Sequence, residues 1–208
     1  MTTPSDTART APQPPTDSTP ATPFDTAPQT ATGKAMCHFT MSLDGFIAGR
    51  DHSMEWMTDF TARPGLIDEY LTTTGAVLGG RAGFDAFPDA SSLYGGAWTG
   101  RVFVLTHHPD DAPPSDRITF LDCDVAEALE IAREAAGGKN VEVLSASIGR
   151  QLLERGLLDE IHLHIAPVLL GDGIRLYDSP GGEPVRLSFA MGDDPRRIVN
   201  VRATPTPD

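Results

Sequence analysis

Lysine is the scarcest charged residue in this sequence, with only Lys34 and Lys139 among 208 residues. Lys and Arg together number 16 against 29 Asp and Glu, so the formal net charge is −13 at pH 7. No run of basic residues interrupts this acidic balance. A protein that grips a phosphate backbone needs a basic face, so the composition argues against nucleic acid as a partner. It predicts solubility and repulsion from anionic surfaces, and it says nothing of the fold.

Long apolar runs and cysteine pairs are also missing. No window approaches the ~18 consecutive apolar residues of a membrane helix, so we expect no membrane span. The two cysteines, Cys37 and Cys123, lie far apart and form no C-x-x-C pair. We therefore expect two reduced thiols in a cytoplasmic protein without a metal site.

The first 35 residues contain no Val, Ile or Leu, and residues 1–33 carry ten Thr and seven Pro. Such a stretch cannot bury enough apolar surface to offset the entropy of ordering, so we predict a disordered tail over residues 1–35. It lacks the apolar core of a secretory signal. A docking tail is the alternative. We place the folded domain at residues 36–203 and a short flexible end at 204–208.

The folded part alternates apolar strand candidates with amphipathic helices. Its best helix starts at Asp124, which stands in a capping-box relation to Glu127, and ends at Gly137. The alternation predicts an α/β fold with a mostly parallel central sheet, flanking helices and an antiparallel C-terminal edge. The strand candidates are residues 36–41, 75–78, 101–106, 118–121, 141–144 and 161–170, then a closing pair at 185–191 and 197–203; the helices are 59–72, 124–136 and 147–155.

In open α/β sheets, ligands bind beyond the carboxyl ends of the strands. Small or polar residues follow several of these ends. At Ser145-Ala146-Ser147-Ile148-Gly149, backbone N–H groups and a helix N-terminus could face a phosphate, although the Ser-rich turn is by itself more simply an N-cap. Gly79-Gly80-Arg81 offers a close-approach turn beside a cation, and Thr106-His107 offers a hydroxyl and a titratable donor. Taken together, these residues suit the binding of NADPH. Taken singly, Gly80 is explained as a tight turn and Thr106 as a strand end.

Three further features have two interpretations each. Asp44, at a strand end before Gly45, could accept hydrogen bonds from a substrate N–H or form an Asx turn. Trp56 could stack on a planar ring or belong to the core. His162 and His164 alternate on one strand and could be a metal pair, but no third ligand is evident, so partly exposed strand histidines are favoured. Neither a Gly-x-Ser-x-Gly elbow nor a Walker loop occurs.

The segment from Gly156 to Gly173, with Leu158-Asp159-Glu160 and Ala166-Pro167-Val168-Leu169-Leu170-Gly171, closely resembles the hallmark block of a bacterial family. This is the dihydrofolate reductase-like family related to the C-terminal reductase domain of the bifunctional riboflavin-biosynthesis deaminase/reductase. Three further blocks, in the same order, are similar to family blocks: Ser42-Leu43-Asp44-Gly45-Phe46-Ile47-Ala48, Gly80-Arg81 and Val104-Leu105-Thr106. The resemblance covers residues 36–203.

The resemblance implies a reductase that binds NADPH across the carboxyl edge of the sheet. It assigns Gly80, Arg81 and Thr106 to the adenosine and phosphate end and residues 145–149 to the turn under the pyrophosphate. Met41 and Asp44 fall on the nicotinamide and substrate side, with Trp56 lining the site near them; Asp44 is the candidate for orienting the ring or assisting proton delivery. Family members reduce pterin-like or aminopyrimidine rings and are often homodimers, for which the apolar C-terminal strands offer an interface.

The sequence departs from the family pattern at two places. Ser145 and Ala146 stand where the family has glycine, and a Cβ at a position of positive φ or close phosphate approach would weaken cofactor binding. Ala82-Gly83 replaces a basic residue and a Thr, so one cation and one hydroxyl of the phosphate site are missing; His107 is the candidate replacement.

Three hypotheses follow. The first is an NADPH-dependent reductase of a small heterocyclic substrate, like 5-amino-6-(5-phosphoribosylamino)uracil reductase or dihydrofolate reductase. The second is a non-catalytic ligand-binding or interaction protein with a degraded phosphate site. The third is an authentic riboflavin-pathway reductase, against which stands the absence of the deaminase half with its zinc-ligand spacing.

Overall fold

The structure is a computed structural model that describes residues 33–189. The expected tail (1–35) therefore lies outside the described residues, except for residues 33–35. The expected strand at 197–203 and the short C-terminal end at 204–208 also lie outside them. β1 already begins at Ala35, at the last residue of the expected tail.

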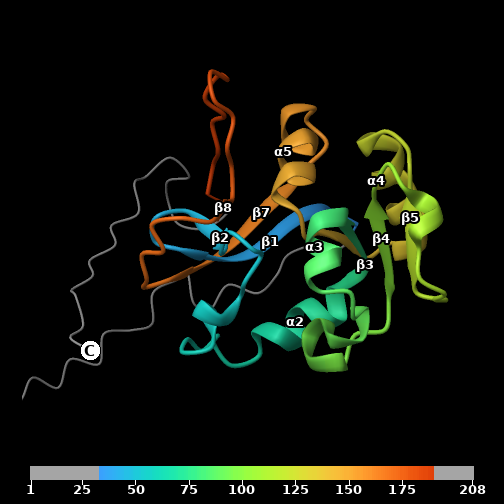
Figure 1. Cartoon of the computed structure of the whole chain (residues 1–208), viewed down its shortest axis with the longest axis horizontal. Helices are drawn as coiled ribbons and strands as arrows, with labels where there is room; N and C mark the ends of the chain where they lie inside the picture. The colour runs from blue at the N-terminus through green and yellow to red at the C-terminus, as the bar shows by residue number, and fades with distance from the viewer. Residues whose placement is uncertain (1–32, 190–208) are drawn as a thin grey trace, which may run out of the picture.

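Six strands form one sheet in the order β5-β4-β3-β6-β1-β7, and every neighbouring pair is parallel (Figure 1). This confirms the predicted mostly parallel α/β sheet. The strands are β1 (Ala35–Ser42), β3 (Thr74–Gly80), β4 (Arg101–Leu105), β5 (Ile118–Leu121), β6 (Asn140–Val143) and β7 (Glu160–Ala166). The helices between them are α2 (Leu66–Thr73), α3 (Arg81–Ala86), α4 (Val125–Ala136) and α5 (Ala146–Glu154), with short 3-10 turns η1 (Glu55–Met57), η2 (Ala90–Gly96) and η3 (Pro109–Asp111).

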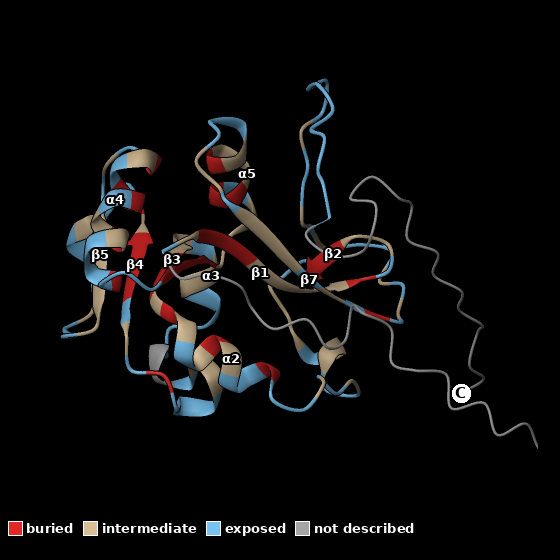
Figure 2. Cartoon of the chain, turned by 180° about the vertical axis from the view of Figure 1, so that it is seen from behind, coloured by how far each residue is buried: buried red, intermediate tan, exposed pale blue. Residues whose placement is uncertain are grey.

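α4 and α5 cover one face of the sheet, while α2 and η2 cover the other. Alternation along β3 sends Leu78 toward the α4 side and Val77 toward the opposite side. α4 buries a stripe that runs from Val125 to Ala136, as its helical spacing predicts. Figure 2 shows the buried residues concentrated in the central strands and in the helix faces that meet them.

The ends of α4 form as the sequence predicts. The Asp124 carboxylate accepts a hydrogen bond from Ala126 N at 2.9 Å, which caps the first turn, and Gly137 closes the helix at φ 59°. Gly75 on β3 lets α4 approach closely, because a Cβ at this position would fall onto the Ala136 carbonyl. Among the described residues, no helix has the length and apolar character needed to cross a bilayer.

The C-terminal edge differs in detail from the sequence prediction. β7 ends at Ala166 rather than Leu170, because Pro167 follows it and cannot donate to a ladder. Residues 185–189 form no strand, contrary to the expected strand at 185–191, and 190–203 lie outside the described range. The antiparallel pairing that the structure describes joins β2 (Phe46–Ala48) to β8 (Ile174–Arg175) in a separate small sheet. The segment after β8 projects away from the domain near α5 (Figures 1 and 2), where Ser179 Oγ donates to Glu154 at 3.3 Å.

Candidate active site

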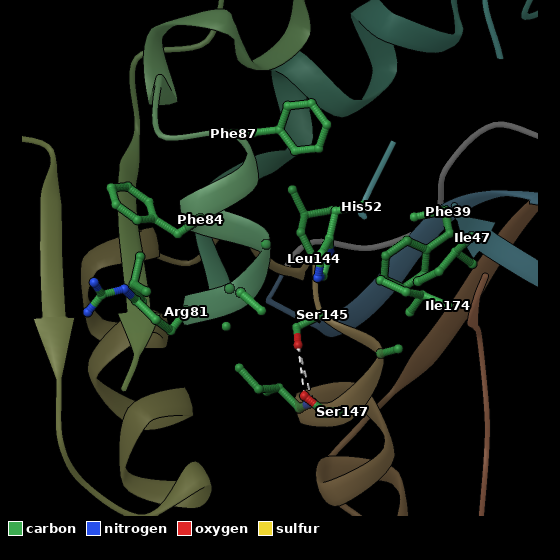
Figure 3. Close-up of a pocket in the computed structure, with 18 of the residues that line it drawn as sticks. Phe39, Ile47, His52, Arg81, Phe84, Phe87, Leu144, Ser145, Ser147 and Ile174 are labelled. Atoms are coloured by element: carbon green, nitrogen blue, oxygen red, sulfur yellow. Dashed lines mark hydrogen bonds between the residues drawn. The ribbon is translucent and has the colours of Figure 1, made fainter. Parts of the chain in front are cut away.

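A cleft of about 1630 Å³ lies at the carboxyl ends of the central strands. β3, β4 and β6 bring Gly80, Thr106 and Ser145 to its wall, and Phe46–Ala48 with Ile174–Leu176 line the opposite side. The close-up in Figure 3 shows Ser145 and Ser147 at the start of α5, with Phe39, Ile47 and Ile174 grouped on one side. The cleft exceeds the ~300–1,000 Å³ of ordinary ligand pockets, so it has room for a dinucleotide and a second molecule.

Gly80 and Ser145 meet at one side of the cleft, which we call the phosphate side because the sequence predicts a phosphate site at Gly80, Thr106 and Ser145. A Cβ on Gly80 would stand 3.0 Å from Ser145 Oγ and 3.7 Å from Ile148 Cδ1. The glycine therefore permits the carboxyl ends of β3 and β6 to approach each other, and it keeps the backbone accessible there. The sequence predicted that Gly79-Gly80 lets the backbone approach a phosphate, and that role stays a prediction.

The expected strain at Ser145 is not present. Its backbone is extended at φ −152° and ψ 122°, and Ala146 is already the first residue of α5. Neither residue has a positive φ, so the backbone accepts a Cβ at both positions. Ser145 caps α5, with its Oγ 3.5 Å from Ile148 N and 3.2 Å from Ser147 Oγ. The Ser145 side chain occupies space beside Gly80, where its Oγ stands 3.0 Å from the position of a Cβ on the glycine.

Thr106 and His107 follow β4 on the same edge. Thr106 is buried, and its Oγ1 accepts a hydrogen bond from His108 N at 3.1 Å, which leaves the hydroxyl hydrogen available. The His107 side chain is 96% exposed, with Nδ1 3.2 Å from Asp122 Oδ1. His107 is therefore at the rim, near an acid that competes with any phosphate for it.

Arg81 lies at the cleft, but its guanidinium bonds elsewhere. Nε donates to Asp85 at 2.7 Å and Nη1 to Asp111 at 3.2 Å, and these carboxylates raise the pKa of Arg81. In Figure 3 the side chain points away from Ser145. Two other arginines line the cleft, and sequence reasoning missed both. Arg150 lies on α5 and pairs with Glu154. Arg175 lies on β8, over the Phe46 ring. Neither follows a strand end in a motif, so only the fold brings them to the cleft.

Four predicted site residues, Met41, Asp44, Trp56 and Gly149, do not line this cleft. Gly149 lies on the core side of α5, where a Cβ would stand 2.5 Å from Cys37 Sγ. Trp56 lies in η1 with its buried Nε1 unpartnered within the described residues, while its neighbours Met54 and Met57 reach the cleft.

Asp44 holds the loop that follows β7. Its carboxylate accepts hydrogen bonds from Ser42 Oγ at 2.6 Å, Leu170 N at 3.1 Å and Gly171 N at 2.7 Å. The Ser42 bond, together with the backbone N–H groups, lowers the pKa of Asp44 to about 2. The carboxyl group is thus ionised at neutral pH, and its contacts are those of a tether for a loop whose residues 171–173 line the cleft. Its assignment as a catalytic or substrate-binding residue stays a prediction.

A second group of polar side chains lies under the α2 side of the cleft, and sequence reasoning did not assemble it. His38 on β1 lines the cleft; its Nδ1 is 2.7 Å from Glu142 Oε1, and its Nε2 is 2.9 Å from His164 Nε2. The Tyr70 ring stacks on His38 with centroids 3.5 Å apart. We call this the histidine cluster; its members are His38, Tyr70, Tyr94, Glu142, His162 and His164.

Burial sets the protonation of two members of the histidine cluster. It lowers the pKa of His164 to about 4, with His38 and His162 adding repulsion, so His164 is neutral at pH 7. Burial and the nearby Glu142 carboxylate raise the pKa of Tyr94 well above its ordinary value, so its hydroxyl stays a donor. Its bond to Glu142 Oε2 measures 2.5 Å. Tyr94 reaches this position from a left-handed conformation at φ 53°.

The signal that would have found the histidine cluster is topological. β1 and β7 are adjacent and in register, with His38 opposite His162 and Thr40 opposite His164. The alternating histidines of β7 therefore share a face with His38, which the sequence did not single out. Within residues 33–189, no three His, Cys, Asp or Glu side chains are arranged to hold a metal ion.

The parallel sheet and the cleft at its carboxyl edge define an α/β protein of the kind that binds ligands beyond its strand ends. Residues 34–191 match the family model described as the RibD C-terminal domain. This match spans more than half of the chain, and the chain belongs to that family. The dihydrofolate reductase-like fold expected from the sequence is confirmed.

The chain is similar to distant relatives in both sequence and structure. The uncharacterized protein YwjB of Bacillus subtilis is 26% identical over 148 residues, which cover 69% of this chain and 82% of YwjB. A putative riboflavin biosynthesis protein from Shewanella superposes with a TM-score of 0.59 at 19% identity, over 72% of this chain and 86% of that one. The riboflavin biosynthesis reductase Rib7 of Saccharomyces cerevisiae superposes at 0.51 with 16% identity, over 77% and 84%. At these identities the two structures establish the fold alone.

Proposed function

We propose that this protein is an NADPH-dependent reductase of a small heterocyclic substrate with a pterin-like or aminopyrimidine ring. One observation carries the proposal: Gly80 and the capped N-terminus of α5 converge on a cleft that is large enough for a dinucleotide and a second molecule. Backbone N–H groups at a helix start favour a phosphate. Membership of the RibD C-terminal domain family agrees with this assignment.

The residues present fit the cofactor. The N–H groups of Ala146 and Ser147 begin α5 and have no partner within the helix, so they would hold a pyrophosphate. Thr106, with its available hydroxyl hydrogen, and Gly80 would flank the adenosine end. When bound, NADPH supplies the hydride, and the protein supplies orientation and electrostatics.

An acidic domain that takes a polyanion needs local cations. Arg81, Arg150 and Arg175 all border the cleft. Arg81 and Arg150 are paired with carboxylates at the surface, where the exchange of such a partner for a phosphate costs little. The Arg175 guanidinium carbon lies 4.5 Å from the centroid of the Phe46 ring, which holds this third cation at the cleft.

The test is a titration of the protein into NADPH with the cofactor fluorescence as the signal. Wild type should shift the emission, and Arg81→Ala should weaken binding by about tenfold, the worth of one charged hydrogen bond. Arg101→Ala is the matched control, because Arg101 is an exposed arginine at the opposite, N-terminal end of β4. If millimolar NADPH changes neither the fluorescence nor the melting temperature of wild type, the proposal fails.

A non-catalytic ligand-binding protein is the second candidate, and one observation favours it. The Arg81 guanidinium is bonded to Asp85 and Asp111 and points away from Ser145, as a vacated phosphate site would allow (Figure 3). Binding of pterins or aminouracils without any oxidation of NADPH would support this candidate.

A role in the riboflavin pathway is the third candidate, and complementation of a reductase-deficient riboflavin auxotroph tests it. Failure of the well-expressed protein to complement would count against that role.

We also propose that the protein forms a homodimer. Apolar side chains lie exposed along β7 and in the segment after β8, where Ile165 is 51% and Leu187 64% exposed. Exposed apolar side chains on these two segments offer contact area for a second copy of the chain. Light scattering should give twice the monomer mass, and Leu187→Asp should lower it; a monomeric wild type at micromolar concentration would refute the dimer.

A further inference from the structure

Apolar side chains from three strands lie opposite the phosphate side of the cleft. Phe39 on β1, Ile47 on β2 and Ile174 on β8 all line the cleft, and Figure 3 shows them grouped together. We call these three residues the apolar wall. Ligand pockets bury the faces of a planar ring against such side chains, and a few placed polar groups fix its orientation. The apolar wall therefore suits the face of an uncharged ring and leaves the polar edge of that ring to be held by another residue.

His52 is a polar side chain of the same cleft lining, and it is half-buried. Figure 3 shows it between the apolar wall and the side that carries Arg81 and Phe84. The hydrogen bond that His52 makes within residues 33–189 comes from its backbone N–H, so its imidazole has no hydrogen-bond or ion-pair partner there. A neutral imidazole has one donor and one acceptor. His52 therefore brings an unused donor and an unused acceptor to the cleft.

The backbone of His52 is held in a left-handed conformation at φ 63°. Among the non-glycine residues that the structure describes, only Tyr94 shares a positive φ, because a Cβ makes this conformation costly. Two backbone hydrogen bonds close the turn: Gly49 N donates to Ser53 O at 2.9 Å, and His52 N donates to Gly49 O at 3.1 Å. Strain that the surroundings maintain is typical of residues whose side-chain position serves a ligand. The turn therefore fixes the direction from which the His52 side chain enters the cleft.

The turn that carries His52 is fastened to the loop after β7. Arg50 in the turn pairs with Asp172 in that loop. The two backbones also pack closely, because a Cβ on Gly173 would overlap the last carbonyl of β2. The same loop is tethered by Asp44 and leads directly into β8. His52 and the apolar wall thus belong to one connected part of the protein, so a ligand meets a polar group that is already in place.

We propose that His52 is a substrate-binding residue that hydrogen-bonds the polar edge of a flat, uncharged heterocycle whose face lies on the apolar wall. This inference rests on the proposed function and deepens it, because it names the residue that selects the ring. The contact needs no change of protonation, since the imidazole can donate to a ring carbonyl or accept from a ring N–H. The rings that fit carry C=O and N–H groups side by side, as pterins and aminouracils do. A ring of the same shape without these groups should gain nothing from His52.

The experiment measures ring binding by calorimetry, with saturating NADP⁺ and without it. Two probes of the same shape are compared: lumazine, a pyrazine ring fused to uracil, and quinoxaline, a pyrazine ring fused to benzene. His52→Ala should weaken lumazine binding about tenfold, the worth of one good hydrogen bond. Quinoxaline, which has no C=O or N–H, should change by less than about twofold, and this difference isolates the contact. The affinity for NADPH, measured by its fluorescence, should be unchanged.

Two further variants keep the test decisive. His52→Gly should fold at least as well as wild type, because glycine accepts φ 63° without strain, and it should lose lumazine as His52→Ala does. His108→Ala is the matched control, because His108 is an exposed histidine that lines the same cleft after β4. It should leave the affinity for both rings unchanged.

The outcomes separate the role of His52 from the proposed function. If the folded His52 variants bind lumazine as wild type does, or lose quinoxaline and NADPH equally, the role of His52 is overturned while the reductase stands. If wild type binds neither ring, the ring site is refuted. If NADPH neither binds nor is oxidised with any ring, yet lumazine binding still depends on His52, the proposed function fails and the ring site stands.

Discussion

The two sides of the cleft are built from different kinds of interaction. On the phosphate side, short local motifs after β3, β4 and β6 supply backbone groups and exposed cations, each explained by a few neighbouring residues. On the α2 side, the histidine cluster joins five elements, and its side chains depend on one another for hydrogen bonds. The first side should therefore tolerate substitution, and the second should lose stability when a single member is removed.

Tyr70→Ala should give the largest effect. Tyr70 is 2% exposed, stacks on His38 and contacts both His162 and His164. Truncation of a buried aromatic residue costs about 3–5 kcal/mol, and urea denaturation measures it. Tyr70→Phe keeps the ring and should cost only about 0.5–1.5 kcal/mol for the lost hydrogen bond. A loss below 1 kcal/mol for Tyr70→Ala would abolish the distinction between the two sides.

Gly149→Ala should rank second and should act through packing alone. The added Cβ would stand 2.5 Å from Cys37 Sγ, and overpacking of a core costs about 1–3 kcal/mol. Cys37→Ala removes the opposing sulfur, so the double variant should recover part of the loss in a mutant cycle. If Gly149→Ala instead weakened NADPH binding at unchanged stability, the residue would belong to the phosphate side, as the sequence predicted.

Sequence reasoning grouped Gly80, Thr106 and Ser145 at one edge but did not group the histidine cluster, and the reason is physical. Gly80, Thr106 and Ser145 each follow an apolar run, and the carboxyl ends of parallel strands meet at one edge, so no strand order is needed to bring them together. His38 and His164 meet only because β1 lies next to β7. Nothing in their local sequence states that pairing.

The fold was predictable where a local rule fixes it. The apolar stripe of α4 and its Asp124 cap appear in the structure as the spacing indicates. α3 and β8 were missed, because a short helix directly after Gly80 and a two-residue strand have no periodic signal. The antiparallel edge was predicted as a pair of strands at 185–191 and 197–203. Residues 185–189 form no strand, because alternating apolar residues do not reveal whether a partner strand is present, and 197–203 lie outside the described residues.

Ser145 tests the phosphate side with a smaller effect. Ser145→Ala should cost about 0.5–1 kcal/mol through the lost cap of α5, and Ser145→Gly only a few tenths (about 0.3 kcal/mol). Because the side chain stands over Gly80, Ser145→Gly should also tighten NADPH binding in the fluorescence titration. Ser147→Gly is the matched control at a site that does not crowd Gly80. Weaker binding in Ser145→Gly would mean that the hydroxyl itself contacts the cofactor.

Asp44→Asn should give the smallest effect, and it should depend on pH. Asp44 tethers the loop whose residues 171–173 border the cleft. Its pKa is lowered from 3.8 to about 2 in the folded state, and the stabilisation is therefore present above pH 3.8 and lost as the pH falls toward 2. The melting temperature of Asp44→Asn should lie below that of wild type at pH 6, and the two should converge near pH 2. Asp59→Asn, at an exposed position between η1 and α2, is the control substitution. Equal curves for Asp44→Asn and wild type at pH 6 would refute the tether and return Asp44 to the substrate side.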